Sequence, residues 1–383
     1  MSKQKTTINK NTNISLFDSL TPIFLLVGLL YVNVNIYGDS SLEGSNQFIL
    51  LIGAAIAFLV GLKNKIQVDF IFNTISKNIK SISNPIIILL LVGALSGTWL
   101  LSGIIPSMIY YGFNIINASF FLPACVIISA IVAIATGSSW STSATIGIAL
   151  IGIGKALGFE VGVVAGAVIS GAYFGDKMSP LSDTTNLAAA VAGSNLFDHI
   201  RYMMITTVPT ICIALVFFVF YNLFNLPSEN LNTVNYIESI KDFFYISPIL
   251  FIVPLIVVLM IIKKINPIIS LFVGTLAAAL FTLIFQSELI DNIINQNSNI
   301  GVSTYTIIMD SIVSKTTIET NTLFLNELLT SGGMSGMLDT IWLVICAMIF
   351  GGVMEAIGAL KSISLSLLNI AKSTLNLFAS TIL

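Results

Sequence analysis

The sequence predicts an all-α polytopic membrane protein with about ten or eleven transmembrane segments, some of them discontinuous helices. Hydrophobic residues make up 56% of the 383 residues, and charged residues only 9%. A soluble domain is roughly 45–50% apolar and about 25% charged. The mean hydropathy of +0.97 points the same way. We therefore expect a multi-pass protein whose partner is the lipid bilayer of the cell membrane.

Charge and cysteine content argue against several other classes. The formal net charge is -2, which is no signature of nucleic-acid binding. The cysteines Cys125, Cys212 and Cys346 lie far apart without CxxC spacing, which favours core packing over disulfides or a thiolate metal site. An enzyme is not expected, because the HExxH motif is missing and the only histidine, His199, is distant from candidate serine nucleophiles. We expect no cofactor.

Apolar segments of membrane-spanning length follow one another along the chain. A hydrocarbon core of about 30 Å needs roughly 20 apolar residues in a helix. Spans are expected at 20–38, 47–62, 85–104, 114–136, 203–226, 246–262, 267–286 and 340–358, with a further span starting near residue 362. Two regions do not fit: residues 137–147 are too polar, and residues 161–197 are too long for one straight span.

Lysines are concentrated in alternate loops. They lie before the first span, between the second and third, and after the sixth, at Lys3, Lys5, Lys10, Lys63, Lys65, Lys77, Lys80, Lys263 and Lys264. The loop at 39–46 contains acids and no basic residue. Because cytoplasmic loops are enriched in Lys and Arg, we expect the N-terminal tail at 1–19 in the cytoplasm. The alternation then requires residues 161–197 to cross the membrane once.

Polar residues interrupt that crossing at 175–186, in the stretch GDKMSPLSDTTN. Gly175 is flexible and Pro180 lacks an amide proton, so the helix is expected to break around them. Unpaired backbone groups in hydrocarbon cost several kcal/mol each, so irregular backbone survives there only in a protein-lined or wet cavity. The sequence thus predicts a discontinuous helix whose break lines a site within the membrane.

Three charged residues occupy the predicted break: Asp176, Lys177 and Asp183. A charged side chain in mid-membrane costs about 2.5–3.5 kcal/mol on insertion scales, so these residues are expected to face a site rather than lipid. Two structural alternatives stay open. Asp176 and Lys177 could form a salt bridge that only holds helices together, or the stretch could be a cytoplasmic loop between two short helices.

The second polar region, GSSWSTSATIG at 137–147, carries six hydroxyl side chains in eight positions. They are Ser138, Ser139, Ser141, Thr142, Ser143 and Thr145. A single hydroxyl in a membrane helix usually bonds back to the preceding turn or to a neighbouring helix. Six of them are better explained by a ligand, because hydroxyl, carbonyl and carboxylate oxygens replace the hydration shell of a small hard cation.

These two regions resemble the NhaC-type Na+/H+ antiporter family, within the ion transporter superfamily. The resemblance lies in TGSSWSTSATIGIALIGIG at 136–154 and GAVISGAYFGDKMSPLSDTTNLA at 166–188. Two further stretches are also similar, GTWLLSGIIPSMIYYG at 97–112 and FGGVMEAIG at 350–358. The resemblance implies a secondary active antiporter that exchanges Na+ for H+. Relatives in the family also exchange malate and lactate, so a Na+- or H+-coupled organic acid exchanger is the alternative.

The resemblance also implies two inverted repeats around a midplane site, within a single transporter domain over 1–383. The first repeat, with the ion site, is expected at 85–200, and the second starts in 340–383. The family's second half is longer, and the last apolar run ends at Leu383 without a flanking charge. We therefore expect a truncated chain that lacks part of the second half of the site.

The residues suggest exchange by competition. A carboxylate in a poorly hydrated cavity favours its protonated form, whereas bound Na+ favours the ionised form. Asp176 and Asp183 are the candidate exchanging groups, and Lys177 is a candidate counterion. The candidate oxygen ligands are Ser179, Ser182, Thr184, Thr185, Asn186, Ser138, Ser139 and Thr142. Glu355 is either a site residue of the second half or a buried, paired structural acid. A cation channel would use the same groups and is a further alternative.

Overall fold

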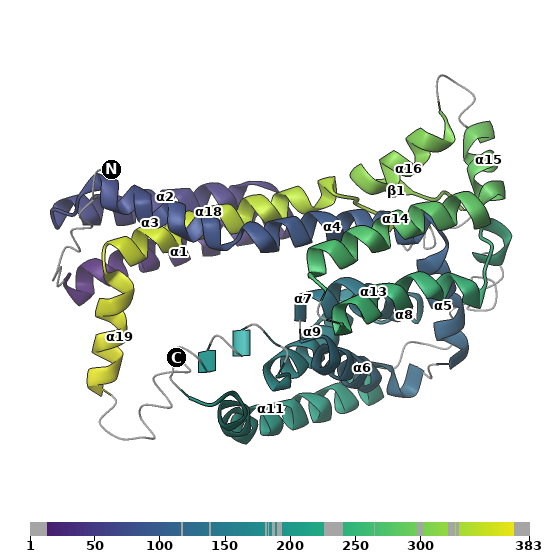
Figure 1. Ribbon diagram of the computed structural model, residues 1–383. Coiled ribbons are helices and arrows are strands. Elements are labelled where there is room, and N and C mark those ends of the chain that lie inside the picture. The colour runs from purple at the N-terminus through teal and green to yellow at the C-terminus, as the bar shows by residue number, and fades with distance from the viewer. Residues whose placement is uncertain are drawn as a thin grey trace, which may run out of the picture. The chain divides into compact units, whose positions relative to one another are not determined.

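The computed structural model is predominantly α-helical (Figure 1). It describes residues 14–115, 118–137, 139–180, 182, 184–185, 188–189, 194–225, 240–263, 265–296, 302–320, 326 and 329–370. Within these ranges, seven helices are long and apolar enough to cross a membrane, and shorter apolar helices accompany them. The expected all-α polytopic fold is therefore confirmed. The total of about ten or eleven segments, the single domain and the inverted repeats stay predictions.

Two compact units divide the chain, one formed by residues 1–87 with 337–383 and the other by residues 88–336. The first unit contains α1 (Leu16–Tyr37), the 3-10 helix η1 (Gly38–Glu43), α2 (Ser45–Lys63), α3 (Val68–Ser81), α18 (Leu338–Ala356) and α19 (Ala359–Ile370). Helix α4 (Ser83–Leu101) begins in this unit and continues into the second.

Small residues allow close helix packing in the first unit. Gly53, Ala57 and Gly61 recur every four residues along one face of α2. A Cβ atom at Gly53 would lie 3.1 Å from Leu26 of α1 and 3.4 Å from Phe350 of α18, and Ala57 is fully buried. Membrane helices associate through such small residues because lipid offers no hydrophobic driving force between them.

The expected loop at 63–84 contains the helix α3. It is amphipathic: Ile71 is fully buried, and the backbone of Ile75 packs against Gly352 of α18. A search for uninterrupted apolar runs misses such a helix, because only one of its faces is apolar.

The second unit begins with most of α4 and then runs through the remaining elements. These are α5 (Ile104–Ile115), η2 (Ala118–Phe120), α6 (Phe121–Thr136), α7 (Ser139–Thr142), the π-helical turn η3 (Ser143–Gly147), α8 (Ile148–Ala156), α9 (Val161–Met178), α11 (Leu196–Phe224), η4 (Pro248–Phe251), α13 (Ile252–Ile262), α14 (Pro267–Phe285), α15 (Ser287–Gln296), α16 (Thr304–Val313), β1 (Thr316–Thr317), β2 (Thr330–Ser331) and η5 (Ser335–Met337). Strands β1 and β2 pair antiparallel, with Thr316 opposite Ser331.

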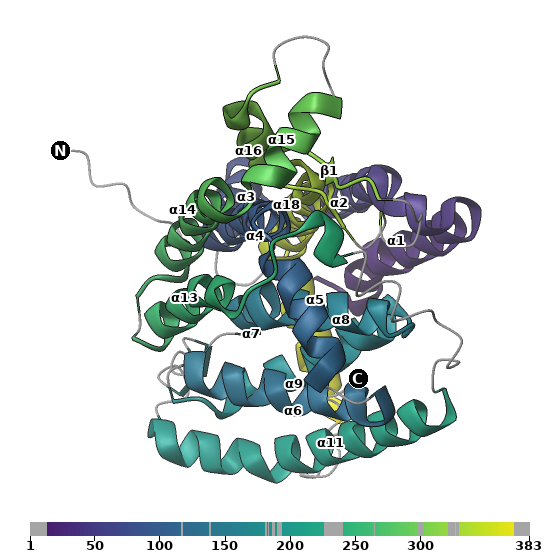
Figure 2. The ribbon, with the colours of Figure 1, turned by 90° about the vertical axis from the view of Figure 1, so that its right-hand side faces the viewer.

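Two hydrophobic clusters form the core of the second unit. The first joins α4, α5, α13 and α14 around fully buried residues such as Trp99 and Leu271. The second joins α6, α8, α9 and α11 around Phe121, Val126 and Val164. In Figure 2, α6, α9 and α11 lie side by side. This second cluster fixes the helices that carry the predicted site.

Candidate functional site

Helix α9 ends where the predicted break begins. It runs from Val161 to Met178, and the amide of Ser179 donates to the carbonyl of Asp176 at 3.2 Å before Pro180 follows. The helix therefore ends inside the predicted break, and its continuation in the same crossing stays a prediction. The part assigned to Gly175 is wrong, because Gly175 lies inside the helix and does not interrupt it. Its lack of a Cβ atom serves helix packing instead.

Helices α6 and α9 run parallel and in close contact. A Cβ atom at Gly171 would lie 3.0 Å from the amide nitrogen of Ala130, and one at Gly175 would lie 2.8 Å from that of Ile134. Further along, the Ser179 hydroxyl donates to the carbonyl of Ile134 at 2.7 Å. Because the contacts advance in the same direction along both helices, their C-terminal ends meet at one place.

The polar stretch at 137–147 is interrupted as expected. Helix α6 stops at Thr136, and Gly137 takes a left-handed conformation with φ 69° that glycine adopts without steric cost. The short α7 follows, and residues 143–147 form a π-helical turn. Helix α8 begins directly after it, at Ile148. Such π-turns disturb the regular hydrogen-bond ladder and occur frequently at functional sites.

One hydrogen bond joins the two interrupted regions. The hydroxyl of Ser139, at the start of α7, donates to Oδ2 of Asp176, near the end of α9, at 2.8 Å. Ser139 is 5% exposed, Asp176 is half-buried and Thr142 is fully buried. The structure thus brings together a carboxylate and a hydroxyl that lie 37 residues apart in the sequence.

The other predicted hydroxyl ligands close the end of α9. Thr185 donates its hydroxyl to the carbonyl of Lys177 at 3.3 Å, and its amide donates to the Ser182 hydroxyl at 3.3 Å. The hydroxyls of Ser182 and Thr184 share a hydrogen bond of 2.9 Å. Ser182 is fully buried and Thr185 nearly so, whereas Thr184 is exposed. The Thr185 hydroxyl thus satisfies part of the free carbonyl end of the helix.

Two further predicted side chains are exposed, and several others lie outside the described residues. Lys177 is exposed and forms no ion pair with Asp176, although both side chains are described. Glu355 is exposed rather than buried, and its Oε2 accepts from the Asn78 amide at 2.9 Å within the first unit. Asp183, Asn186 and Ser138, as well as Lys3, Lys5, Lys10 and Lys264, lie outside the described residues.

The electrostatics around Asp176 suit a cation. The C-terminal end of a helix carries about half a negative elementary charge, which arises from its unsatisfied carbonyls. Here two parallel helices, α6 and α9, end side by side, and the Asp176 carboxylate stands next to the end of α9. Broken helices of membrane carriers coordinate Na+ and H+ with such carbonyl ends.

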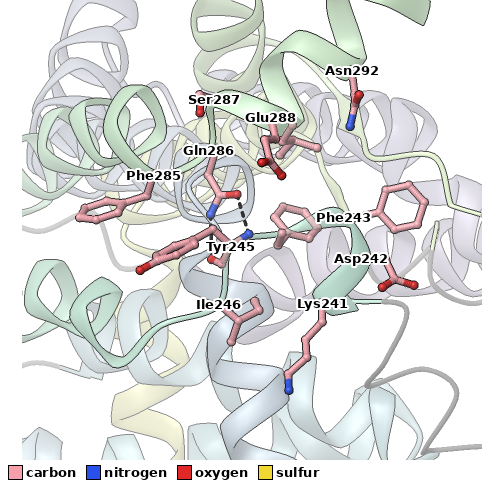
Figure 3. A pocket seen from close by; sticks show the side chains of 12 residues that line it. Lys241, Asp242, Phe243, Tyr245, Ile246, Phe285, Gln286, Ser287, Glu288 and Asn292 are labelled. Carbon is pink, nitrogen blue, oxygen red and sulfur yellow. Dashed lines mark hydrogen bonds between the residues drawn. The ribbon is translucent and has the colours of Figure 1, made fainter.

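Gln286 was not predicted, and it lies in a polar pocket of about 440 Å3 (Figure 3). It is 2% exposed. Its Oε1 accepts from the Tyr245 amide at 3.1 Å, and its Nε2 donates to the carbonyls of Tyr245 and Ser102, each at 3.1 Å. Ser102 lies in the break between α4 and α5, where Gly103 has φ 76°. The amide therefore anchors backbone and is no ligand; a glutamine directly after an apolar span is its only sequence signal.

Comparisons with known proteins give the family of the chain. The model of the Na+/H+ antiporter family matches residues 171–383. The chain is 33% identical to an uncharacterized Na+/H+ antiporter of Haemophilus influenzae over 97% of the chain and 76% of that protein. It is 36% identical to the malate-2H+/Na+-lactate antiporter of Bacillus subtilis, over 83% of the chain and 65% of that protein. It is 35% identical to the Na+/H+ antiporter NhaC of Alkalihalophilus pseudofirmus, over 78% and 61%.

The chain thus spans about three quarters of the first of these relatives and less than two thirds of the other two. No solved structure matches it. The family match covers more than half of the chain and includes Asp176 and the residues that close the end of α9. The chain therefore belongs to the Na+/H+ antiporter family, of the NhaC type that its two polar motifs predict.

Proposed function

We propose that the protein is a secondary active antiporter that exchanges Na+ for H+ across the cell membrane. The observation that carries the proposal is the 2.8 Å hydrogen bond between Ser139 and Asp176, where two parallel helices end. The NhaC relatives, which are named as Na+/H+ antiporters, support the same ions.

Exchange follows from competition for one carboxylate. Na+ binds the ionised Asp176 together with hydroxyl and carbonyl oxygens, and a proton neutralises the same group. Both cannot occupy the site at once. If the carrier changes its orientation only when the carboxylate holds one of them, a proton gradient drives Na+ in the opposite direction. Asp183, seven positions further along the chain, is the proposed second exchanging group.

Coupled flux in proteoliposomes tests this function. Vesicles loaded at acidic pH with a pH-sensitive dye should become alkaline inside when Na+ is added outside, because Na+ enters as protons leave. K+ should have little effect. Na+ entry without proton movement would identify a channel and contradict the proposal. The malate/lactate relative supports organic acid exchange as a second candidate. This candidate predicts that the pH changes only when malate is present on one side of the membrane and lactate on the other.

We also propose that the N-terminus and the segment at 63–84 are cytoplasmic, as the lysine distribution suggests. The structure offers two exposed positions for a test, Leu42 in η1 and Lys77 in α3. In a background where the exposed Cys212 is replaced by serine, a membrane-impermeant maleimide should label Leu42→Cys in intact cells. It should label Lys77→Cys only after permeabilisation. Labelling of Lys77→Cys in intact cells would contradict this orientation and place the segment at 63–84 outside the cell.

A further inference from the structure

Helix α3 of the first unit runs back along its neighbours instead of lying across their ends. A Cβ atom at Gly61, near the end of α2, would lie 3.2 Å from the side chain of Ile71 and 2.9 Å from that of Ile357, which follows α18. A Cβ atom at Gly352, five residues earlier in the chain, would lie 2.9 Å from the Cα atom of Ile75. As α3 advances, α18 therefore goes back, and the two helices lie side by side (Figure 1).

This arrangement places α3 within the length of two membrane-spanning helices. Both α2 and α18 are long and apolar enough to cross a membrane. Lys80 follows Ile71 by nine residues, which corresponds to about 13 Å at 1.5 Å per residue. The 19 residues of α2 extend over about 28 Å. Since Ile71 is level with Gly61, close to the end of α2, Lys80 lies about halfway along that helix.

Polar residues form one continuous stripe along α3. This polar stripe consists of Asp69, Asn73, Ser76, Lys77 and Lys80. The spacing i, i+4, i+7, i+8 and i+11 places all five on one face of the helix. All five are exposed, whereas Ile71 on the opposite face is fully buried. Among the residues that the structure describes, neither Lys77 nor Lys80 has an ion pair or a side-chain hydrogen bond.

Neither lipid nor protein suits the polar stripe as a neighbour. Charged side chains within the membrane are costly and face a water-filled space or the protein interior instead of hydrocarbon. A lysine can extend its ammonium group toward the membrane surface, but the short side chains of Asn73 and Ser76 cannot reach it. A covering of protein would bury two lysines without partners, which is also strongly unfavourable. Water satisfies the charged and the neutral members of the stripe alike.

We propose that the polar stripe faces water inside the membrane, so that an aqueous path runs along α3 from the ends of α2 and α18 to about the middle of these helices. The partners of this surface are water and the small hydrophilic solutes that water carries. The path belongs to the first unit, whereas Asp176 belongs to the second, and it does not depend on the exchange of Na+ for H+. Only the side on which the path opens rests on the proposed orientation, which places the opening toward the cytoplasm.

The reactivity of single cysteines tests the path. The variants Asn73→Cys, Ser76→Cys and Lys80→Cys are made in a background where the exposed Cys212 is replaced by serine. Membrane fragments that are open on both faces are treated with a sulfonated, membrane-impermeant maleimide. Ser76→Cys and Lys80→Cys should react about tenfold or more faster than a lipid-facing cysteine at the same depth, because apolar surroundings suppress the reactive thiolate.

Ala55→Cys is the matched control for Ser76→Cys. Ala55 is an exposed residue of the apolar helix α2. It is six residues from Gly61, and Ser76 is five residues from Ile71, so the two positions lie at about the same depth. After unfolding in sodium dodecyl sulfate all variants should react equally, which shows that each thiol is intact.

Two results would overturn the proposal. One is reaction of Ser76→Cys and Lys80→Cys at the slow rate of Ala55→Cys, which would mean that lipid or protein covers the stripe. The other is fast reaction of Asn73→Cys alone, because water would then stop near the membrane surface. If Lys80→Cys does not insert into the membrane, Ser76→Cys decides by the same comparison, since it exchanges only an oxygen for a sulfur atom.

Discussion

Asp176→Asn is expected to abolish Na+-dependent proton exchange while the protein stays folded in the membrane. Asparagine has nearly the same size, and its Oδ1 can still accept the hydrogen bond that Ser139 donates at 2.8 Å. Only the titrating charge is lost. Without it, Na+ loses its counter-charge and the proton loses its binding group, so both halves of the exchange fail.

The measurement uses everted vesicles from cells that express the protein or one of its variants. A pH-sensitive dye reports proton efflux after Na+ is added, and immunoblotting reports the amount of protein. Asp183→Asn is expected to behave in the same way. Glu43→Gln removes an exposed carboxylate from η1 and is the matched control, which should exchange at the parental rate. If both aspartate variants exchange Na+ for protons at near-parental rates and with an unchanged pH profile, these two residues have only a structural role.

The sequence predicts the helices better than it predicts their contacts. Apolar runs of membrane-spanning length locate α1, α2, α14 and α18 to within a few residues, because hydrocarbon demands a continuous apolar segment of fixed length. The amphipathic α3 escapes this criterion. Its position depends on burial against α2 and α18, which the local pattern does not encode.

The candidate site shows the same limit. Asp176 is predicted as a site residue because a charge is costly in a membrane, and Ser139 because it belongs to a cluster of hydroxyl residues. The structure joins the two directly. Gly175, by contrast, is predicted as a helix breaker and lies inside α9. A glycine can indicate either flexibility or close approach, and only the neighbouring helix α6 decides between these. The role of Gln286 cannot be predicted for the same reason, since its three hydrogen bonds join two residues distant in the sequence, Tyr245 and Ser102.

Gly171→Ala is expected to destabilise the protein, whereas Gly162→Ala in the same helix is not. A Cβ atom at Gly171 would lie 2.9 Å from the carbonyl carbon of Val126 and 3.0 Å from the Ala130 amide nitrogen, both of them backbone atoms of α6. Backbone cannot rotate away, so α6 and α9 must separate. Overpacking of this kind costs about 1–3 kcal/mol. Gly162 has nothing within 4 Å of the added atom, so alanine there improves helix propensity at no steric cost.

The separation of the two helices should also disturb the proposed ion site at Asp176, because the packing of α6 against α9 holds their C-terminal ends together. Gly175→Ala, whose Cβ atom would lie 2.5 Å from the Ala133 Cβ atom, is therefore expected to reduce exchange by more than its loss of stability explains. Thermal unfolding of the purified variants gives the stability, and Na+-driven proton efflux per folded protein gives the exchange rate. Equal unfolding temperatures for Gly171→Ala and Gly162→Ala would show that α6 and α9 are not in close contact. Parental exchange by folded Gly175→Ala would show that their contact does not position Asp176.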